Sequence, residues 1–197
     1  MKYSSRIKES TILDTLELNA QGYFLVSAHR QENIDLPVRL SELLESLNWI
    51  ATEFKIPLIV SMHPRMQEKI QHSRVKLENS IKLHQSFGFL DYVKLQQNAL
   101  VVLSDSGSLP EESAILDFPA ITIRDSMERQ EAFEAGTIIM AGIAPKGISE
   151  ALRIVMSTPR ARTIPVDYTV EDTSTRVVNF IASTIHSHAF RSGLRKP

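Results

Sequence analysis

Short apolar runs alternate with amphipathic segments along most of the chain. Residues 36–54 place apolar side chains at the spacing of one helix face, whereas residues 99–103 form a short run rich in branched residues. This alternation favours a parallel sheet, because each crossover between parallel strands needs a connecting helix. The sequence therefore predicts an α/β fold, a Rossmann-like parallel sheet with helices on both faces. The predicted strands cover residues 23–28, 57–61, 81–84, 99–103, 119–123 and 137–141.

The carboxy-terminal part of the chain is expected to stand apart from this sheet. Residues 158–172 contain two prolines and are predicted to link the sheet to a last helix over residues 172–188. We expect a domain over residues 1–165, then a carboxy-terminal helix and tail over residues 166–197 whose apolar stripe packs toward another domain. The other predicted helices cover residues 6–18, 36–54, 89–97, 109–116 and 146–157, with one more after Pro64.

Composition and charge exclude several classes of function. The net charge is −1 and the basic residues are scattered, whereas nucleic-acid-binding proteins usually carry a basic stripe. There is no cysteine, which excludes disulfides and thiol chemistry. No apolar run approaches the roughly 18 residues of a membrane helix, and residues 1–9 do not resemble a signal peptide. We expect a cytoplasmic protein that binds neither nucleic acid nor a membrane.

Polar residues follow four of the predicted strands, at residues 29–33, 62–65, 104–108 and 124–129. Ligands of open α/β sheets bind outside the carboxyl ends of the strands, so these segments hold the candidate site residues. Neither a GxGxxG nor a Walker loop is present, and no histidine pair stands at metal-ligand spacing, so no cofactor or metal is expected. His63 and His84 receive no role, because a lone histidine after a strand is more often a satisfied polar residue.

The segment after the fourth strand is the most informative. Ser106 and Gly107 leave backbone N–H groups at the start of a helix, where the helix dipole also favours a phosphate. Glu112 lies about one turn into that helix, where its carboxylate can accept hydrogen bonds from two ribose hydroxyls. The alternative is a helix start with acidic residues in its first turn, which stabilises a helix without any ligand.

Four further side chains are candidates at this edge. Arg129 and Arg30 are candidate diphosphate clamps, since guanidinium groups bind phosphate in bidentate fashion, although surface ion pairing would also explain them. His29 can donate to the charge that develops on a leaving phosphate, or it can be a satisfied polar residue. Tyr92 can stack on a base, or it can belong to the core.

Taken together, the segments resemble one family. SAHRQEN at residues 27–33 resembles the TAHRREN segment of the non-hydrolysing UDP-N-acetylglucosamine 2-epimerases. SDSGS at residues 104–108 with EES at residues 111–113 resembles their TDSGGxQEE. RDSMERQE at residues 124–131 resembles their RDTTERPE, and EAGT follows at residues 134–137. The order and the spacing of these segments also agree with the family.

The resemblance implies the carboxy-terminal domain of a glycosyltransferase-B-type architecture, with UDP or a UDP-amino sugar held between two domains. It places Ser106 and Gly107 at the diphosphate and Glu112 at the ribose. It implies that Arg129 binds the phosphates, that His29 lies on the leaving-group side, and that Tyr92 lies against uracil. Full-length relatives are commonly dimers, so a homodimer or pairing with an amino-terminal domain is expected.

The family inverts C2 of the sugar without NAD, by eliminating UDP to give a bound 2-acetamidoglycal and then adding UDP back. Its acid–base carboxylates lie on the amino-terminal domain and have no counterpart here. We therefore expect this chain to be the nucleotide-binding half of the enzyme and to be inactive alone. The alternatives are a non-catalytic nucleotide-sugar binding module and the carboxy-terminal domain of a glycosyltransferase.

Departures from the family pattern bear on the substrate. Ser108 replaces the second glycine of TDSGG, and Gln130 replaces the proline of RDTTERPE. The string EESAILDFPA at residues 111–120 looks more like the branch that acts on UDP-2-acetamido-2,6-dideoxy-L-talose. That branch makes UDP-N-acetyl-L-fucosamine for capsule or O-antigen, which implies a deoxy-amino-L-sugar as the substrate.

Overall fold

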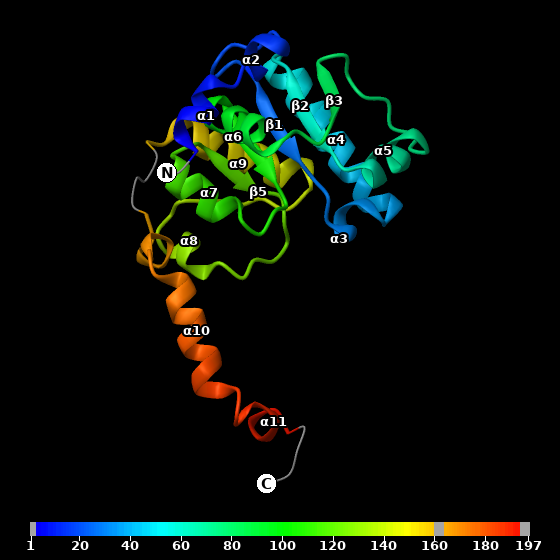
Figure 1. The fold of residues 1–197 in the computed structure, drawn as a ribbon. Helices are drawn as coiled ribbons and strands as arrows, with labels where there is room; N and C mark the ends of the chain where they lie inside the picture. The colour runs from blue at the N-terminus through cyan, green and yellow to red at the C-terminus, as the bar shows by residue number, and fades with distance from the viewer. Residues whose placement is uncertain (1–2, 160–163, 194–197) are drawn as a thin grey trace. The chain divides into compact units, whose positions relative to one another are not determined.

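The computed structural model describes residues 3–159 and 164–193. Its contacts divide the chain into two units, Met1–Pro165 and Val166–Pro197 (Figure 1). Parts of the predicted linker and of the predicted tail, residues 160–163 and 194–197, lie outside the described residues. In the parts that the structure describes, no helix combines the length and the hydropathy that crossing a membrane requires.

A six-stranded parallel sheet forms the centre of the first unit. The strand order is β3-β2-β1-β4-β5-β6, so the direction of winding reverses between β1 and β4. This arrangement confirms the predicted Rossmann-like fold, and the reversal marks the position where such sheets bind ligands. The strands are β1 (Phe24–Ser27), β2 (Leu58–Met62), β3 (Ile81–Gln85), β4 (Val101–Ser104), β5 (Ala120–Thr122) and β6 (Ile139–Met140).

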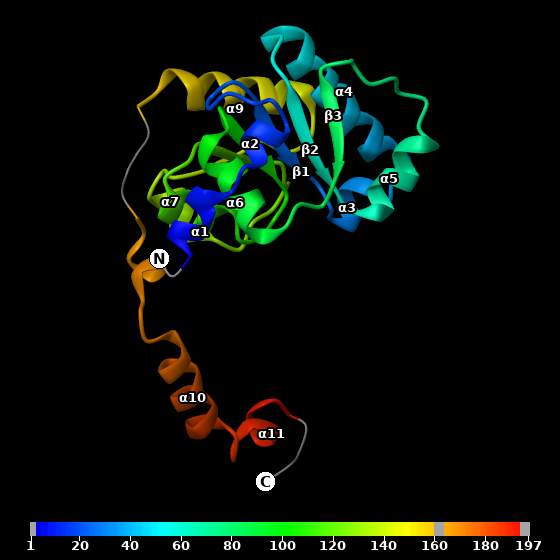
Figure 2. The same ribbon diagram turned by 45° about the horizontal axis from the view of Figure 1, so that its top comes forward.

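Helices cover both faces of this sheet (Figure 2). On one face α4 (Pro37–Phe54) packs against α9 (Pro145–Ser157), and their buried side chains share a core with Phe24 and Val26 of β1. The intervening Leu25 is equally buried, and it points to the opposite face because side chains alternate along a strand. That face carries α1 (Ser4–Glu9), α2 (Ile12–Thr15), α6 (Phe89–Asn98) and α7 (Leu109–Leu116).

Two predicted helices are each divided in the structure. The helix predicted over residues 6–18 is wrong as one element, because Ser10 adopts an extended conformation between α1 and α2. The Ser10 hydroxyl donates to Asp91 Oδ1 at 2.6 Å and accepts from the backbone N–H of Ile12, so it starts the second helix. The helix predicted over residues 172–188 becomes α10 (Thr173–Thr184) and α11 (His188–Arg191). The remaining short elements are α3 (Gln31–Ile34), α5 (Pro64–Gln71), α8 (Gln130–Glu134) and the 3-10 helix η1 (Val166–Thr169).

The second unit presents an apolar helix surface. None of the residues of α10, all of which the structure describes, is buried. The exposed fractions of its large apolar side chains are 51% for Val177, 62% for Val178, 69% for Phe180 and 51% for Ile181. Such a stripe has the spacing of a helix face that packs against another surface.

Candidate active site

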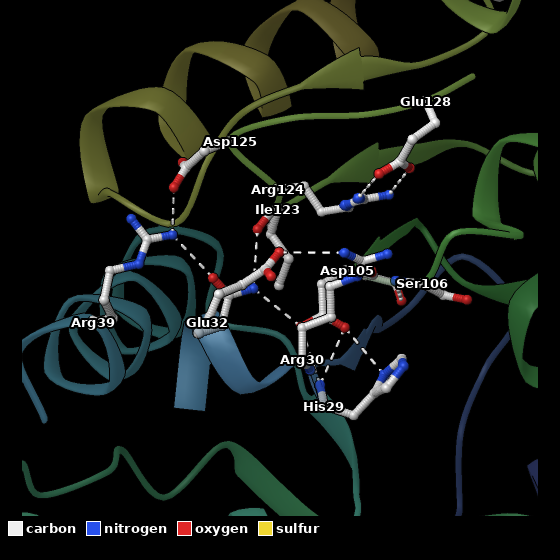
Figure 3. A network of polar contacts seen from close by, with 12 residues as sticks. His29, Arg30, Glu32, Arg39, Asp105, Ser106, Ile123, Arg124, Asp125 and Glu128 are labelled. Atoms are coloured by element: carbon white, nitrogen blue, oxygen red, sulfur yellow. Dashed lines mark hydrogen bonds and ion pairs between the residues drawn. The ribbon is translucent and has the colours of Figure 1, made fainter. Parts of the chain in front are cut away.

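A buried carboxylate lies at the point where β1 and β4 end. Asp105 directly follows β4 and its side chain is fully buried. Its oxygens accept hydrogen bonds from the backbone N–H groups of His29 at 3.1 Å and Arg30 at 3.0 Å, and from Asn33 Nδ2 at 3.0 Å. Figure 3 shows Asp105 beside His29 and Arg30, which belong to the segment that follows β1. The carboxylate therefore ties that segment to the end of β4 across the reversal point.

The imidazole of His29 is the fourth partner of this carboxylate. Its Nδ1 lies 3.0 Å from Asp105 Oδ1, while about half of the His29 side chain is exposed. The hydrogen bond with Asp105 raises the pKa of His29 above its ordinary value, although partial burial and Arg30 oppose this rise. Burial alone would raise the pKa of Asp105, but its hydrogen bonds with His29, Arg30 and Asn33 leave that pKa below the ordinary value. Both shifts favour an imidazolium–carboxylate pair, and with Nδ1 engaged, Nε2 is the ring nitrogen left to meet a ligand.

A cavity of about 220 Å³ opens beside this pair. Most of its lining residues carry a polar group, and several of them are serines that lie at or just after strand ends. The lining residues are Ser27, His29, Ser61, Ser86, Phe87, Tyr92, Ser104, Ser106 and Glu112. Of the predicted site residues, the structure thus brings His29, Tyr92, Ser106 and Glu112 into one cavity.

Tyr92 lies in the wall of this cavity, on the first turn of α6. Burial raises its pKa to about 12, with smaller contributions from the carboxylates Glu112 and Asp105, while a hydrogen bond with Ser27 opposes the rise. The phenol therefore stays neutral at physiological pH and keeps an apolar ring at the cavity.

The start of α7 is shaped around Arg30. Arg30 Nε donates to the backbone carbonyl of Asp105 at 2.9 Å, which holds the guanidinium over the turn that precedes α7. A Cβ atom on Gly107 would lie 3.9 Å from Arg30 Nη2, so this glycine lies directly beside the guanidinium. The backbone N–H of Ser106 donates to Ser104 Oγ at 3.1 Å, which fixes the turn. Arg30 and Gly107 thus lie next to the cavity, although neither lines it.

Arg129 contacts the first turn of α7 through Glu111. Its Nε donates to Glu111 Oε1 at 2.5 Å, and 42% of its side chain is exposed. Glu111 precedes the cavity residue Glu112 in the first turn of α7. Arg129, like Arg30 and Gly107, does not line the cavity.

Several residues of the polar network around Asp105 are given no role by the sequence analysis. Asp105 lies inside the quoted SDSGS string and Asn33 ends SAHRQEN, but only their contact in space shows what they do. Arg124 is 1% exposed and makes a bidentate ion pair with Glu128, whose side chain is 65% exposed. Arg39 Nη2 joins Asn33 Oδ1 at 3.0 Å to Asp125 Oδ2 at 2.6 Å. No group of three potential metal ligands occurs among the described residues.

Comparisons with known proteins agree with this geometry. The profile of the UDP-N-acetylglucosamine 2-epimerase family matches residues 1–182. A UDP-N-acetylglucosamine 2-epimerase of Methanocaldococcus jannaschii is 34% identical over 142 residues, which is 70% of this chain and 39% of that relative. A UDP-2,3-diacetamido-2,3-dideoxy-D-glucuronate 2-epimerase of Pseudomonas aeruginosa is 32% identical and is matched over 82% of this chain and 44% of its own length.

Solved structures give the same result. The UDP-N-acetylglucosamine 2-epimerase of Rickettsia bellii superposes with a TM-score of 0.80 at 31% identity, over 98% of this chain and 53% of that one. The M. jannaschii enzyme in complex with UDP-GlcNAc and UDP gives a TM-score of 0.78 at 28% identity, over 91% of this chain and 50% of that one. The chain therefore spans roughly half the length of the relatives it matches.

Proposed function

The chain belongs to the UDP-N-acetylglucosamine 2-epimerase family, and from this we propose that it is the nucleotide-binding half of a UDP-sugar 2-epimerase. One observation carries the proposal. A single polar cavity at the reversal point of the sheet joins a histidine paired with a buried carboxylate, the start of α7 and the carboxylate of Glu112. These are the groups that a nucleoside diphosphate needs at one place, because its phosphates require donors and its ribose requires an acceptor.

Each predicted residue has a place in the proposed complex. Ser106, Gly107 and Arg30 hold the diphosphate at the start of α7, where N–H groups and a guanidinium lie together. Glu112 accepts from the ribose hydroxyls, and the neutral ring of Tyr92 lies against uracil. Arg129 adds a second cation near the phosphates, and its ion pair with Glu111 keeps it at the first turn of α7.

His29 is proposed to act on the leaving group. In the elimination step a base removes the C2 proton, the C1–O bond breaks, and the electron pair of that bond leaves on the diphosphate oxygen. The imidazolium of His29 stabilises this oxygen, since a donor placed where charge develops lowers the barrier. The Asp105 carboxylate favours the protonated imidazole and orients it, as its hydrogen bond raises the pKa of His29.

The base at C2 is proposed to come from outside this chain. Asp105 is a poor base because its hydrogen bonds with His29, Arg30 and Asn33 hold its pKa below the ordinary value. Glu112 is engaged on both oxygens by Ser108 and Gln96. We therefore propose that the half of the relatives' length that this chain does not span supplies the proton-transfer carboxylates. The 197-residue chain then binds UDP without epimerising a UDP-sugar.

Substrate, assembly and location extend the same proposal. The EESAILDFPA string supports UDP-2-acetamido-2,6-dideoxy-L-talose as the substrate, in the synthesis of a capsule or O-antigen precursor in the cytoplasm. The apolar stripe of α10 supports a second unit that packs toward an amino-terminal domain. Such packing, or a homodimer, covers the exposed Val178 and Phe180 side chains.

Isothermal titration calorimetry with UDP tests the binding half of this proposal. The unaltered chain is expected to bind UDP, and Glu112→Ala is expected to lower the affinity about tenfold through the loss of a charged acceptor. Ser41→Ala, a change on α4 away from the cavity lining, serves as the control. No detectable heat with millimolar UDP would contradict the proposal.

Deuterium exchange tests the chemistry in a protein that joins this chain to the half of a relative that it does not span. An epimerase incorporates deuterium from D₂O at C2 of the sugar, because the C2 proton is removed and replaced. Transfer of the sugar to an acceptor without C2 exchange would instead favour a glycosyltransferase.

A further inference from the structure

The carboxylate of Glu112 is held on both of its oxygens by side chains. Ser108 Oγ donates to Oε1 at 2.6 Å, and Gln96 Nε2 donates to Oε2 at 2.6 Å. Both distances are shorter than is most common between neutral groups, which is typical of charge-assisted hydrogen bonds. The carboxylate is thus fixed in one orientation at the edge of the cavity before any ligand arrives.

Gln96 makes this contact from a buried position. The residue lies on α6, is 1% exposed, and reaches across to Glu112 on α7. Its Oε1 atom is also buried and has no hydrogen-bond partner among the described residues. An unpaired buried carbonyl lowers stability, and a leucine would pack between the helices without that loss. The buried amide therefore lowers stability relative to leucine, and its hydrogen bond to Glu112 offers a reason for an amide at this position.

Ser108 connects the same carboxylate to the phosphate end of the cavity. A serine hydroxyl has one proton, and Ser108 gives its proton to Glu112. In the 3.1 Å contact between the hydroxyls of Ser106 and Ser108, Ser106 is then the donor. The hydrogen bonds run in one direction, from Ser106 through Ser108 to Glu112.

We propose that Gln96 is a positioning residue for ribose recognition and that, with Ser108, it makes the cavity select ribonucleotides. This inference rests on the proposed function, because it takes Glu112 as the acceptor of the ribose hydroxyls. Each carboxylate oxygen that accepts one hydrogen bond keeps a second lone pair. Two neighbouring ribose hydroxyls can therefore still donate to the carboxylate. A carboxylate that is already oriented loses less conformational freedom when the ribose binds.

The test compares UDP with 2′,3′-dideoxy-UDP, which lacks both hydroxyls. The unaltered chain is expected to bind UDP about tenfold more tightly than the dideoxy analogue, a ratio that corresponds to about 1.4 kcal/mol. In Gln96→Leu this ratio is expected to fall to about two, because the affinity for UDP drops while that for the analogue stays the same. Gln97→Leu, the same change at the next position of α6, is the matched control and is expected to keep the tenfold ratio.

A second variant keeps the test decisive if Gln96→Leu does not fold. Ser108 is exposed, so Ser108→Gly is expected to fold and to reduce the same ratio by releasing Glu112 Oε1. Equal losses for UDP and the analogue, or an unchanged ratio in the variants that fold, would overturn the positioning role and leave the proposed function intact. Failure of the unaltered chain to bind UDP would instead overturn the proposed function, and this inference with it.

Discussion

The ends of β1 and β2 carry the same local pattern but form different structures. Each strand is followed by a histidine, by an arginine one or two residues later, and by a short helix. After β1, His29 pairs with Asp105, whose side chain is 0% exposed. After β2, His63 caps α5, and its Nδ1 accepts from the backbone N–H of Arg65 at 3.3 Å. Arg65 pairs with Asp35 at 2.6 Å, with 44% and 28% of the two side chains exposed.

The difference comes from the neighbouring strand and not from the local sequence. β1 lies beside β4, whose end supplies a buried carboxylate to the loop of β1, whereas β2 lies between β1 and β3. A buried carboxylate shifts the pKa of the histidine that it contacts and orients the imidazole ring. A partly exposed ion pair, such as the one between Arg65 and Asp35, contributes little. The reversal point of the sheet therefore makes His29 a candidate for chemistry and leaves His63 as a helix cap.

Removal of the buried charge should have the largest effect. Asp105→Asn replaces a carboxylate that serves two backbone N–H groups and the side chains of Asn33 and His29 with a neutral amide. We expect the free energy of unfolding to fall by about 3 kcal/mol, because buried donors lose a charged acceptor. Asp35→Asn, the matched change at the carboxylate that pairs with Arg65, should cost less than about 1 kcal/mol. Urea denaturation of both variants measures the difference, and similar losses would remove the distinction between the two strand ends.

Replacement of each histidine tests the difference between the ends of β1 and β2 through the affinity for UDP. His29→Gln should weaken UDP binding about tenfold, because a charged donor near the diphosphate is lost. His63→Gln should leave the affinity within about twofold, since the His63 side chain serves the backbone of α5. Calorimetric titration with UDP measures both, and a greater loss for His63→Gln would refute the assignment.

The pH dependence of stability provides a smaller signal. The folded-state pKa of His29 lies above its ordinary value of 6.5, so the folded state binds the proton more tightly than the unfolded state. The resulting stabilisation is fully present below about pH 6.5 and is lost as the pH rises through the folded-state pKa. We expect less than about 1 kcal/mol, because half of the imidazole is exposed. Urea denaturation between roughly pH 5.5 and 8.5 should show a decline that His29→Gln lacks; identical profiles would exclude His29 as its source.

The smallest effect is expected at the exposed ion pair after β2. Arg65→Ala removes the contact with Asp35, and exposed pairs of this kind contribute about 0–1 kcal/mol. Thermal denaturation at low and at 0.5 M salt measures the contribution of the charges, since about 0.5 M salt screens exposed pairs. A loss of stability close to that of Asp105→Asn would show that this surface ion pair stabilises the fold as much as the buried carboxylate does.

The sequence predicts the sheet well, and the reason is local. Short apolar runs such as residues 99–103 predict the parallel strands. Once the strands are predicted, the positions of their carboxyl ends follow. The break at Ser10 is harder to predict, because it depends on the hydroxyl of Ser10 reaching Asp91 on α6. The roles of Asp105 and Gln96 are hard to predict from the sequence for the same reason. Each acts on a residue from another segment, and only the fold brings the partners together.

Titration of the ¹⁵N-labelled chain with UDP, followed through backbone amide chemical shifts, tests the central claim most directly. The account predicts that the largest shifts occur at Ser106, Gly107 and Ser108 and at His29 and Arg30, where β1 and β4 end. It predicts that the amides of His63 and Arg65 stay nearly unchanged. Shifts centred on residues 62–65, or no shifts at saturating UDP, would contradict the account.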